Sequence, residues 1–223
     1  MKPVTVEVER KVNGTTVMGK KTYGRQIGEE ELMKVLLRDR PFYDESGGGI
    51  TFSGGEPLMQ PGPLVKLLQA CQREGLHTAV DTSGYARRGV LEQVAEHTGL
   101  FLYDLKHMDP GLHERYTGVD NRLILSNADH LLALGATVIF RIPVIPGINT
   151  SKEELARFIS FLSDRGARLE EVHLLPYHRI AGDKYRRLKM KQTLDEVKEP
   201  EPSAMEEIRE QFGETGLKIL IGG

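Results

Sequence analysis

Six short runs rich in β-branched and aromatic residues alternate with amphipathic segments of helical length from residue 50 to the C-terminus. The runs are ITF (50–52), HTAVD (77–81), LFLYDL (100–105), TVIFRIPVI (137–145), EVHLLPY (171–177) and LKILI (217–221). Repeated strand–helix–strand units imply parallel strands joined by crossover helices. A chain of 223 residues can bury one complete core. We therefore expect a single α/β barrel built on a parallel sheet.

The segments between the strands carry helix start signals and one charged stretch. Ser151 with Glu154, and Ser203 with Glu206, match capping boxes that each open a helix. The first of these helices has one apolar stripe, made of Leu155, Phe158, Ile159 and Leu162. Residues 179–202 are rich in Lys, Arg, Glu and Pro and predict a surface loop.

The first 24 residues break this rhythm and predict a β-hairpin. Valines alternate with polar residues in VTVEVER (4–10), and Asn13-Gly14 is a pair that tolerates the positive φ angles of a type I′ turn. A lone hairpin is only marginally stable, so we expect it to pack on the barrel or on a second chain. The predicted organisation is a hairpin segment over residues 1–24 and the barrel over residues 25–223.

Charge and hydropathy narrow the classes of partner. Thirty basic and 32 acidic residues give a formal net charge of −2, so no overall field favours nucleic acid or an anionic membrane. The sequence has no apolar run long enough to cross a bilayer, and its start, MKPVTVEVERKV, has acidic residues where a signal peptide is apolar. We expect a cytoplasmic protein without nucleic-acid or membrane partners.

The single cysteine limits the metal chemistry of this sequence. Cys71 excludes an internal disulfide, and one thiolate cannot hold a structural zinc ion or an iron–sulfur cluster, which needs three or four. Cys71 lies in helical register with Leu64, Leu67 and Leu68. This spacing predicts a buried structural role for the thiol.

Polar residues collect where the predicted strands end. They occupy Ser53–Glu56, Asp81–Gly84, Asp104–Lys106, Arg141 and Pro176–His178. Each group taken singly could be structural, as a turn or a buried ion pair. In a parallel barrel, however, the carboxyl ends of the strands share one rim, and unpaired charges there cost several kcal/mol unless they meet partners or a ligand. The pattern predicts a ligand site at this rim.

The glycine pair in SGGEP (53–57) favours an amino-acid-like ligand over a phosphate. There is no GxxxxGK[ST] motif, and Glu56 supplies negative charge where a phosphate site needs a cation. Gly54 and Gly55 leave the backbone accessible, and Glu56 suits a ligand ammonium. His107, His113 and His130 lack metal-ligand spacing and are interpreted as surface residues without a role.

Beyond these separate signals, the order of the motifs resembles one family. The relevant stretches are SGGGITFSGGEPLMQ (46–60), HTAVDTSG (77–84), YDLKHMD (103–109) with RYTGV (115–119), RIPVIPGIN (141–149), LLPYH (174–178) and GLKILIGG (216–223). From about residue 28 to residue 223 the chain is similar to glycyl-radical-enzyme activating enzymes of the radical S-adenosylmethionine superfamily, the group that includes the activator of pyruvate formate-lyase.

The resemblance implies a partial (β/α)6 TIM-like barrel that binds S-adenosylmethionine. In that family a CxxxCxxC loop holds a [4Fe-4S] cluster, and reductive cleavage of the cofactor yields a 5′-deoxyadenosyl radical. The radical removes hydrogen from a glycine of the partner, a glycyl-radical enzyme. An electron donor is the second expected partner.

Site roles follow from the same resemblance, residue by residue. It implies that Gly54, Gly55 and Glu56 hold the methionyl ammonium, and that Asp104, Leu105, Lys106 and His178 line the cofactor. Arg141 would add positive charge at the mouth. A monovalent cation beside the cofactor carboxylate would be bound by Asp81, Thr82 and Asp104.

The sequence departs from the family pattern at the cluster, because these 223 residues contain no CxxxCxxC. We therefore expect this chain alone to be inactive in radical formation. The sequence is compatible with a fragment, a truncated gene product or a degenerate relative of the family. Two other functions stay open. One is a Schiff-base aldolase or lyase using Lys106, which the nearby Asp104 disfavours. The other is a non-catalytic module that binds a nucleoside or peptide.

Overall fold

A computed structural model describes residues 4–12, 15–23, 25–169, 171–178 and 197–222. The six predicted strand runs form one parallel sheet in the order β3-β4-β5-β6-β7-β8. Its strands are β3 (Gly49–Phe52), β4 (His77–Thr82), β5 (Leu100–Asp104), β6 (Val138–Val144), β7 (Glu171–Pro176) and β8 (Lys218–Ile221). The predicted parallel α/β sheet is confirmed. Most of the predicted surface loop over 179–202 lies outside the described residues.

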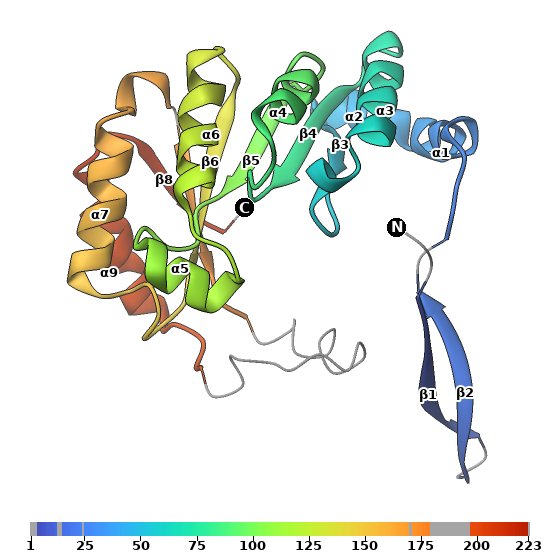
Figure 1. Ribbon diagram of the computed structural model, residues 1–223, viewed down its shortest axis with the longest axis horizontal. Coiled ribbons are helices and arrows are strands. Elements are labelled where there is room, and N and C mark those ends of the chain that lie inside the picture. Colours follow the sequence, from blue (N-terminus) through green and yellow to red (C-terminus); the bar gives the residue numbers. More distant parts are fainter. Residues whose placement is uncertain (1–3, 13–14, 24, 170, 179–196, 223) are drawn as a thin grey trace.

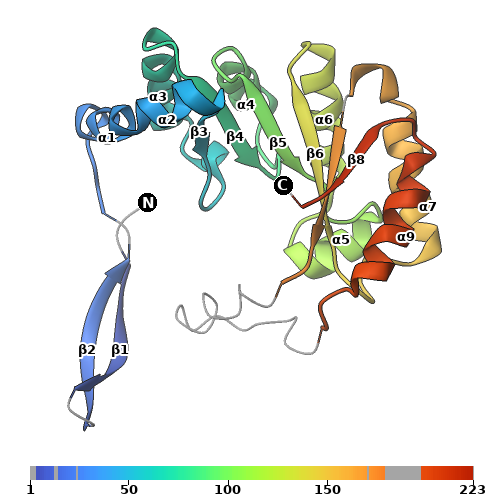
Figure 2. The ribbon, with the colours of Figure 1, turned by 180° about the vertical axis from the view of Figure 1, so that it is seen from behind.

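Helices α1 and α2 precede β3, the other helices connect the strands of the sheet, and helices cover its convex side (Figures 1 and 2). They are α1 (Glu29–Leu36), α2 (Arg40–Ser46), α3 (Pro61–Arg73), α4 (Arg88–Ala95), α5 (Pro110–Thr117), α6 (Arg122–Ala133), α7 (Lys152–Ser163) and α9 (Pro202–Gly213), with short 3₁₀ turns η1 (Leu37–Asp39), η2 (Pro57–Met59) and η3 (Gly166–Arg168). No helix among the described residues has both the length and the apolar character needed to span a membrane.

The two faces of the sheet differ in burial along its central strands β5 and β6. Along β6 every second residue from Val138 to Val144 is buried, whereas Ile139, Arg141 and Pro143 are only half-buried. Because successive side chains of a strand point to opposite faces, one face packs under the helices and the other faces a concave interior. In the described residues β3 and β8 are the two edges of the sheet, so the barrel is open.

Aromatic side chains fix the strands to the helices that cover them. The rings of Tyr103 and Phe140 meet edge to face at 5.7 Å between centroids, and both side chains are fully buried. The Tyr103 hydroxyl donates to the Ile124 carbonyl at 2.7 Å. Burial raises the pKa of Tyr103, so this hydroxyl keeps the proton that it donates. This contact joins β5 to α6 directly beneath the carboxyl ends of the strands.

Of the two serines predicted to start helices, Ser151 does so and Ser203 does not. Ser151 is the N-cap of α7, and its Oγ accepts from the Glu154 amide at 3.2 Å. Ser203, by contrast, lies inside α9, whose N-cap is Glu201 without a side-chain cap bond. Pro202 explains the shift, because a proline at the first helical position has the φ that the helix needs and no N–H to satisfy.

The N-terminal hairpin is present. Strands β1 (Val4–Val12) and β2 (Thr15–Tyr23) pair antiparallel, with Val12 opposite Thr15. The predicted turn residues Asn13-Gly14 lie outside the described part. Figures 1 and 2 show the hairpin projecting away from the sheet, so it does not pack on the barrel, and the alternative, packing on a second chain, stays a prediction. The exposed Val17 and Met18 of β2 are accordingly not covered by the barrel.

Cys71 has the structural role predicted for it. It lies in α3, is fully buried, and its Sγ is 4.0 Å from the Met33 Sδ. Burial raises the pKa of this thiol, which keeps it protonated and unreactive.

Candidate functional site

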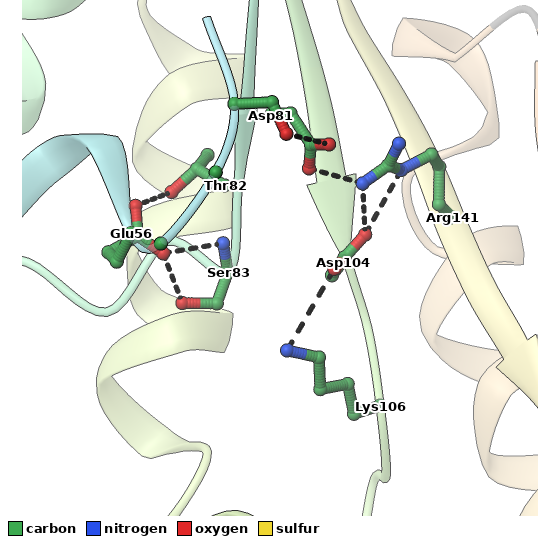
Figure 3. A pocket seen from close by; sticks show the side chains of 10 residues that line it. Glu56, Asp81, Thr82, Ser83, Asp104, Lys106 and Arg141 are labelled. Carbon is green, nitrogen blue, oxygen red and sulfur yellow. Dashed lines mark hydrogen bonds and ion pairs between the residues drawn. The ribbon is translucent and has the colours of Figure 1, made fainter. Parts of the chain in front are cut away.

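The carboxyl ends of β3, β4 and β5, together with β6, surround a pocket of about 380 Å³ (Figure 3). Its lining residues are Ser53, Gly54, Gly55, Glu56, Asp81, Thr82, Ser83, Asp104, Lys106 and Arg141. The fold thus brings most of the predicted rim together, because parallel strands end at a common edge. Figure 3 shows two clusters in the pocket, one centred on Glu56 and one on Arg141.

The Arg141 cluster combines two carboxylates and two cations. The Arg141 Nη2 lies 2.7 Å from the Asp104 Oδ1, its Nε lies 3.0 Å from the same oxygen, and Nη2 also bonds the Asp81 Oδ1. The Lys106 Nζ stands 3.8 Å from the other Asp104 oxygen. Opposite charges are therefore available within a few ångströms of one another, as a zwitterionic ligand requires.

Sheet register creates the central pair of this cluster. Asp104 is the direct cross-strand partner of Arg141, and such partners are close enough for their side chains to bond. Burial raises the pKa of Asp104, although Arg141 and Lys106 act in the opposite direction. The ionised Asp104 thus depends on its cations.

Glu56 is held as a clamp between two loops. Its carboxylate accepts from the Thr82 Oγ1 at 2.5 Å, the Ser83 amide at 2.9 Å and the Ser83 Oγ at 2.6 Å. It also accepts from the Leu58 amide at 3.2 Å, which caps η2. Glu56, which was predicted to bind the ammonium group of a ligand, therefore joins the loop after β3 to the loop after β4.

Gly54 and Gly55 present bare backbone to the pocket. Gly54 has a φ of +125°, in the region that favours glycine, and an added Cβ there would meet no atom within 4 Å. The space beside it is therefore open to a ligand. That both glycines expose main-chain groups to an amino-acid-like molecule stays a prediction.

Leu105 and His178 do not line this pocket. Leu105 is 2% exposed, and its amide extends the sheet by donating to the Arg141 carbonyl at 2.9 Å. His178 lies in a separate hollow with Pro176 and Glu199, and its Nδ1 is 3.7 Å from the Glu199 carboxylate. It follows β7, which pairs with β6 on the side away from β5.

The three residues predicted to bind a monovalent cation are divided between the two clusters. Thr82 is 2% exposed and uses its hydroxyl to bond Glu56 and the Gly84 amide, whereas Asp81 and Asp104 both face Arg141. Neighbouring residues of a strand point to opposite faces, which separates Thr82 from Asp81. Within the described ranges, no group of three or more His, Cys, Asp or Glu side chains could hold a metal ion.

The interpretation of the histidines as surface residues is wrong for two of them. His107 is 4% exposed and His113 is 2% exposed. The His113 Nδ1 lies 2.6 Å from the Val119 carbonyl, and burial lowers the pKa of its ring. His130 is partly exposed and bonds Glu92 at 2.7 Å. Sequence spacing alone could not reveal this burial, because the covering segments come from elsewhere in the chain.

Two serines of the predicted rim, Ser53 and Ser83, were given no individual role by the sequence, yet both line the pocket. Ser53 donates to the Asp81 Oδ2 at 3.0 Å, and Ser83 binds Glu56 through both its amide and its hydroxyl. Both immediately adjoin predicted residues at strand ends. That adjacency was the available signal, since the carboxylates at a shared rim need donors.

Replacing Arg141 with methionine is expected to destabilise the protein by about 1–3 kcal/mol near neutral pH, because Asp81 and Asp104 then face each other without their shared cation. Loss of the cation should raise the pKa of Asp104 further above its ordinary 3.8. Protonation relieves the repulsion, so the deficit should be largest above the raised pKa and shrink as the pH falls through it. Urea unfolding from about pH 4 to about pH 8 measures this.

Arg165→Met is the matched control, since Arg165 also makes a bidentate ion pair, with Asp129 at 2.6 and 2.9 Å, but outside the pocket. Its effect should be smaller, because Asp129 is 51% exposed. An Arg141→Met deficit that is independent of pH would contradict the proposed repulsion.

The structure is an open parallel α/β barrel with a charged pocket at the carboxyl ends of its strands. Comparison with known proteins identifies the family that has this fold. The family model of the radical SAM superfamily matches residues 12–159. Among curated proteins, the choline trimethylamine-lyase activating enzyme of Oleidesulfovibrio alaskensis is 43% identical over 167 residues, 74% of this chain and 54% of that protein. The trans-4-hydroxy-L-proline dehydratase activating enzyme of Clostridioides difficile is 39% identical over 203 residues, 90% of this chain and 67% of that protein.

A solved structure extends the similarity to the fold. The crystal structure of a domain of pyruvate-formate lyase-activating enzyme from Bacteroides vulgatus has a TM-score of 0.67 and 33% identity, covering 79% of this chain and 99% of that one. The chain belongs to the radical SAM superfamily and, within it, to the glycyl-radical-enzyme activating enzymes. It spans 54% and 67% of the lengths of the two curated relatives.

Proposed function

We propose that this chain forms the S-adenosylmethionine-binding barrel of a glycyl-radical-enzyme activase. The observation that carries the proposal is the pairing of opposite charges beside bare glycine backbone in one pocket of about 380 Å³. A methionyl group is a zwitterion, and its ammonium and carboxylate need such complementary charges close together. Family membership supports the same cofactor.

Each half of the methionyl group has partners in the pocket. Asp81 and Asp104 supply negative charge for the ammonium, together with the main chain of Gly54 and Gly55. Arg141 and Lys106 supply positive charge for the carboxylate. When bound and reductively cleaved, S-adenosylmethionine supplies a 5′-deoxyadenosyl radical that can remove hydrogen from a glycine. Glu56 holds the loops that shape this pocket, and we assign it that role in place of direct contact.

The [4Fe-4S] cluster of the family does not fit the residues present. Cys71 is the single cysteine of the sequence, it is fully buried in α3, and it does not line the pocket. A cluster needs three or four thiolates, so we derive no reaction step through it. Radical formation would require thiolates from outside these 223 residues.

The proposed protein partner is a glycyl-radical enzyme, with an electron donor as the second. The relatives are named as activating enzymes of choline trimethylamine-lyase and of trans-4-hydroxy-L-proline dehydratase, both protein targets. We propose that residues 25–223 form the barrel that acts on such a target and that residues 1–24 form a separate hairpin segment.

The Schiff-base alternative is less well supported. A lysine nucleophile is activated by a desolvated site or by another cation nearby. The Lys106 side chain is 42% exposed and lies 3.8 Å from the Asp104 carboxylate. These surroundings lack the apolar burial that would activate Lys106 as an amine.

Calorimetry with S-adenosylmethionine tests the binding proposal. Without a cluster to chelate the ligand, we expect a Kd of about 1 mM, near −4 kcal/mol. L-methionine should compete and adenosine should not, because the site recognises the zwitterion. Arg141→Met should weaken binding, whereas Arg165→Met should leave it unchanged. Micromolar binding that both substitutions leave intact would place the cofactor site elsewhere.

Anaerobic reconstitution with iron and sulfide tests the statement about the cluster. We expect no stoichiometric [4Fe-4S] absorption and no reductive cleavage of S-adenosylmethionine by this chain alone, since one thiol cannot replace three. Cys71→Ser is the control. Stoichiometric cluster uptake that survives Cys71→Ser would show that other ligands exist.

A further inference from the structure

The segment that carries Lys106 has no regular secondary structure of its own. It leaves β5 at Asp104 and reaches α5 at Pro110, and residues 105–109 belong to neither element. Backbone N–H and C=O groups in such a segment need partners from elsewhere when they are buried. The position of Lys106 in the pocket therefore depends on whatever binds this main chain.

Buried side chains from three separate places supply those partners. The Asn149 Nδ2, in the turn after β6, donates to the Lys106 carbonyl at 3.0 Å. The Asn121 Nδ2, at the N-cap of α6, donates to the His107 carbonyl at 2.9 Å and the Met108 carbonyl at 2.7 Å.

The third partner is Glu154, in the first turn of α7. Its Oε1 accepts from the Met108 amide. The sequence pattern predicts a capping box, in which this carboxylate would return to the Ser151 amide. The Ser151 half of that box is present, but the Glu154 carboxylate is directed to Met108 and to the His107 ring, 2.9 Å away. The Glu154 carboxylate thus binds the segment that carries Lys106 and does not complete the capping box of its own helix.

The burial of these groups argues that they serve more than packing. Asn121 and Asn149 are each 2% exposed and Glu154 is 3% exposed. Burying an amide or a carboxylate costs free energy unless every bond is made, and an apolar core would avoid that cost. Asn149 uses both of its donor hydrogens and its oxygen, since it also donates to the Pro143 carbonyl at 2.6 Å and accepts from the Ile145 amide at 2.8 Å.

A neighbouring loop of the pocket is held in the same way. The Asn127 Nδ2 donates to the Gly84 and Ala86 carbonyls, both at 2.8 Å, and so fixes the loop that carries Ser83. Buried amides thus anchor the main chain on both sides of the pocket. Regular elements and such anchors together keep a binding site in one geometry before the ligand arrives.

We propose that Asn121, Asn149 and Glu154 are positioning residues of the cofactor site, which hold the main chain of residues 106–108 so that Lys106 stays beside Asp104. This assignment rests on the proposed binding of S-adenosylmethionine. The three residues do not line the pocket and act through the segment that they bind.

Isosteric substitutions test the assignment. Asn149→Asp keeps the side-chain shape but removes the donors to the Lys106 and Pro143 carbonyls, and Asn121→Asp does the same for His107 and Met108. Each should weaken S-adenosylmethionine binding by about five- to tenfold, because the main chain that carries Lys106 is then held less firmly. Hydrogen exchange of residues 105–109 in the ligand-free protein should become faster in both variants.

Thr78→Val is the matched control. Thr78 is 4% exposed and bonds backbone groups of His97 and Gly99, at the amino end of β4, away from the pocket. Thr78→Val should lower Tm, as we also expect of Asn149→Asp and Asn121→Asp. It should leave the affinity for S-adenosylmethionine and the hydrogen exchange of residues 105–109 unchanged.

The outcomes separate this assignment from the proposed function. Wild-type affinity in folded Asn149→Asp and Asn121→Asp, or an equal loss in Thr78→Val, would overturn the positioning role alone. Wild-type protein that binds no S-adenosylmethionine would overturn the proposed function and this assignment with it. Asn121→Asp acts from a different element, so the test holds if Asn149→Asp fails to fold.

Discussion

Replacing Gly84 with alanine is expected to destabilise the protein by about 3–5 kcal/mol, which is a large part of the stability of a typical domain. Gly84 has a φ of +72°, and an added Cβ would lie 1.7 Å from the Tyr103 hydroxyl oxygen. Tyr103 cannot move aside, because it is fully buried and its hydroxyl bonds the Ile124 carbonyl. A fall in Tm of roughly 10 °C, measured by calorimetry, is the expected result.

Gly135→Ala separates the clash from the backbone strain. Gly135 has nearly the same φ, +76°, but an added Cβ there meets nothing within 4 Å. It should therefore cost only the strain of a left-handed alanine, about 1–2 kcal/mol. Equal losses in the two variants would mean that Tyr103 yields, and that the loop after β4 is not fixed by this contact.

The sequence predicted the sheet and the gathering of charges for one shared reason. Alternating strand and helix patterns imply parallel strands, and parallel strands bring residues that follow them to a common edge. Asp81, Asp104 and Arg141 come together because of this rule and need no knowledge of loop structure. The ring contacts beneath them, such as Tyr103 with Phe140, follow from the same alternation.

The partners of each charge could not be predicted in this way. Glu56 bonds Thr82 and Ser83 through the particular path of two loops, and a pattern of residue types does not define that path. His107 was misread for a similar reason, since Glu154 and Ile148, which lie against it, follow some 40 residues later in the chain. Placement at a rim is a property of topology, whereas burial and pairing depend on tertiary packing.

His178 shows a further limit of the argument from strand ends. It does follow a strand, but β7 lies beyond β6 in the sheet, and the pocket is centred on β3, β4 and β5. In an open sheet, strands far apart in the order share an edge without sharing a pocket. The prediction for Ser203 failed on a shorter scale, where Pro202 at the first helical position replaced the serine cap.

Glu56→Ala is expected to lower the stability of the protein and to abolish the binding of S-adenosylmethionine. The substitution leaves the buried Thr82 hydroxyl and the Ser83 amide without their acceptor, at a cost of about 2–4 kcal/mol for bonds to a charged group. The loops after β3 and β4 then lose the bonds that Glu56 makes between them. Because these loops form one wall of the pocket, S-adenosylmethionine binding should fall below detection by calorimetry. Glu56→Gln, which keeps one acceptor oxygen, should be intermediate in both measurements.

A double-mutant cycle with Ser83→Ala decides how Glu56 acts. If its carboxylate is a clamp, both substitutions remove the bond from the Ser83 hydroxyl, and the double variant should lose less stability than the sum of the single losses. If Glu56 instead contacts the ligand ammonium, as the sequence motif implies, Glu56→Ala should abolish binding with little change in Tm, and the cycle should be additive. The two bonds from Ser83, at 2.9 and 2.6 Å, favour the clamp, because a carboxylate already satisfied by protein donors has little capacity left for a ligand.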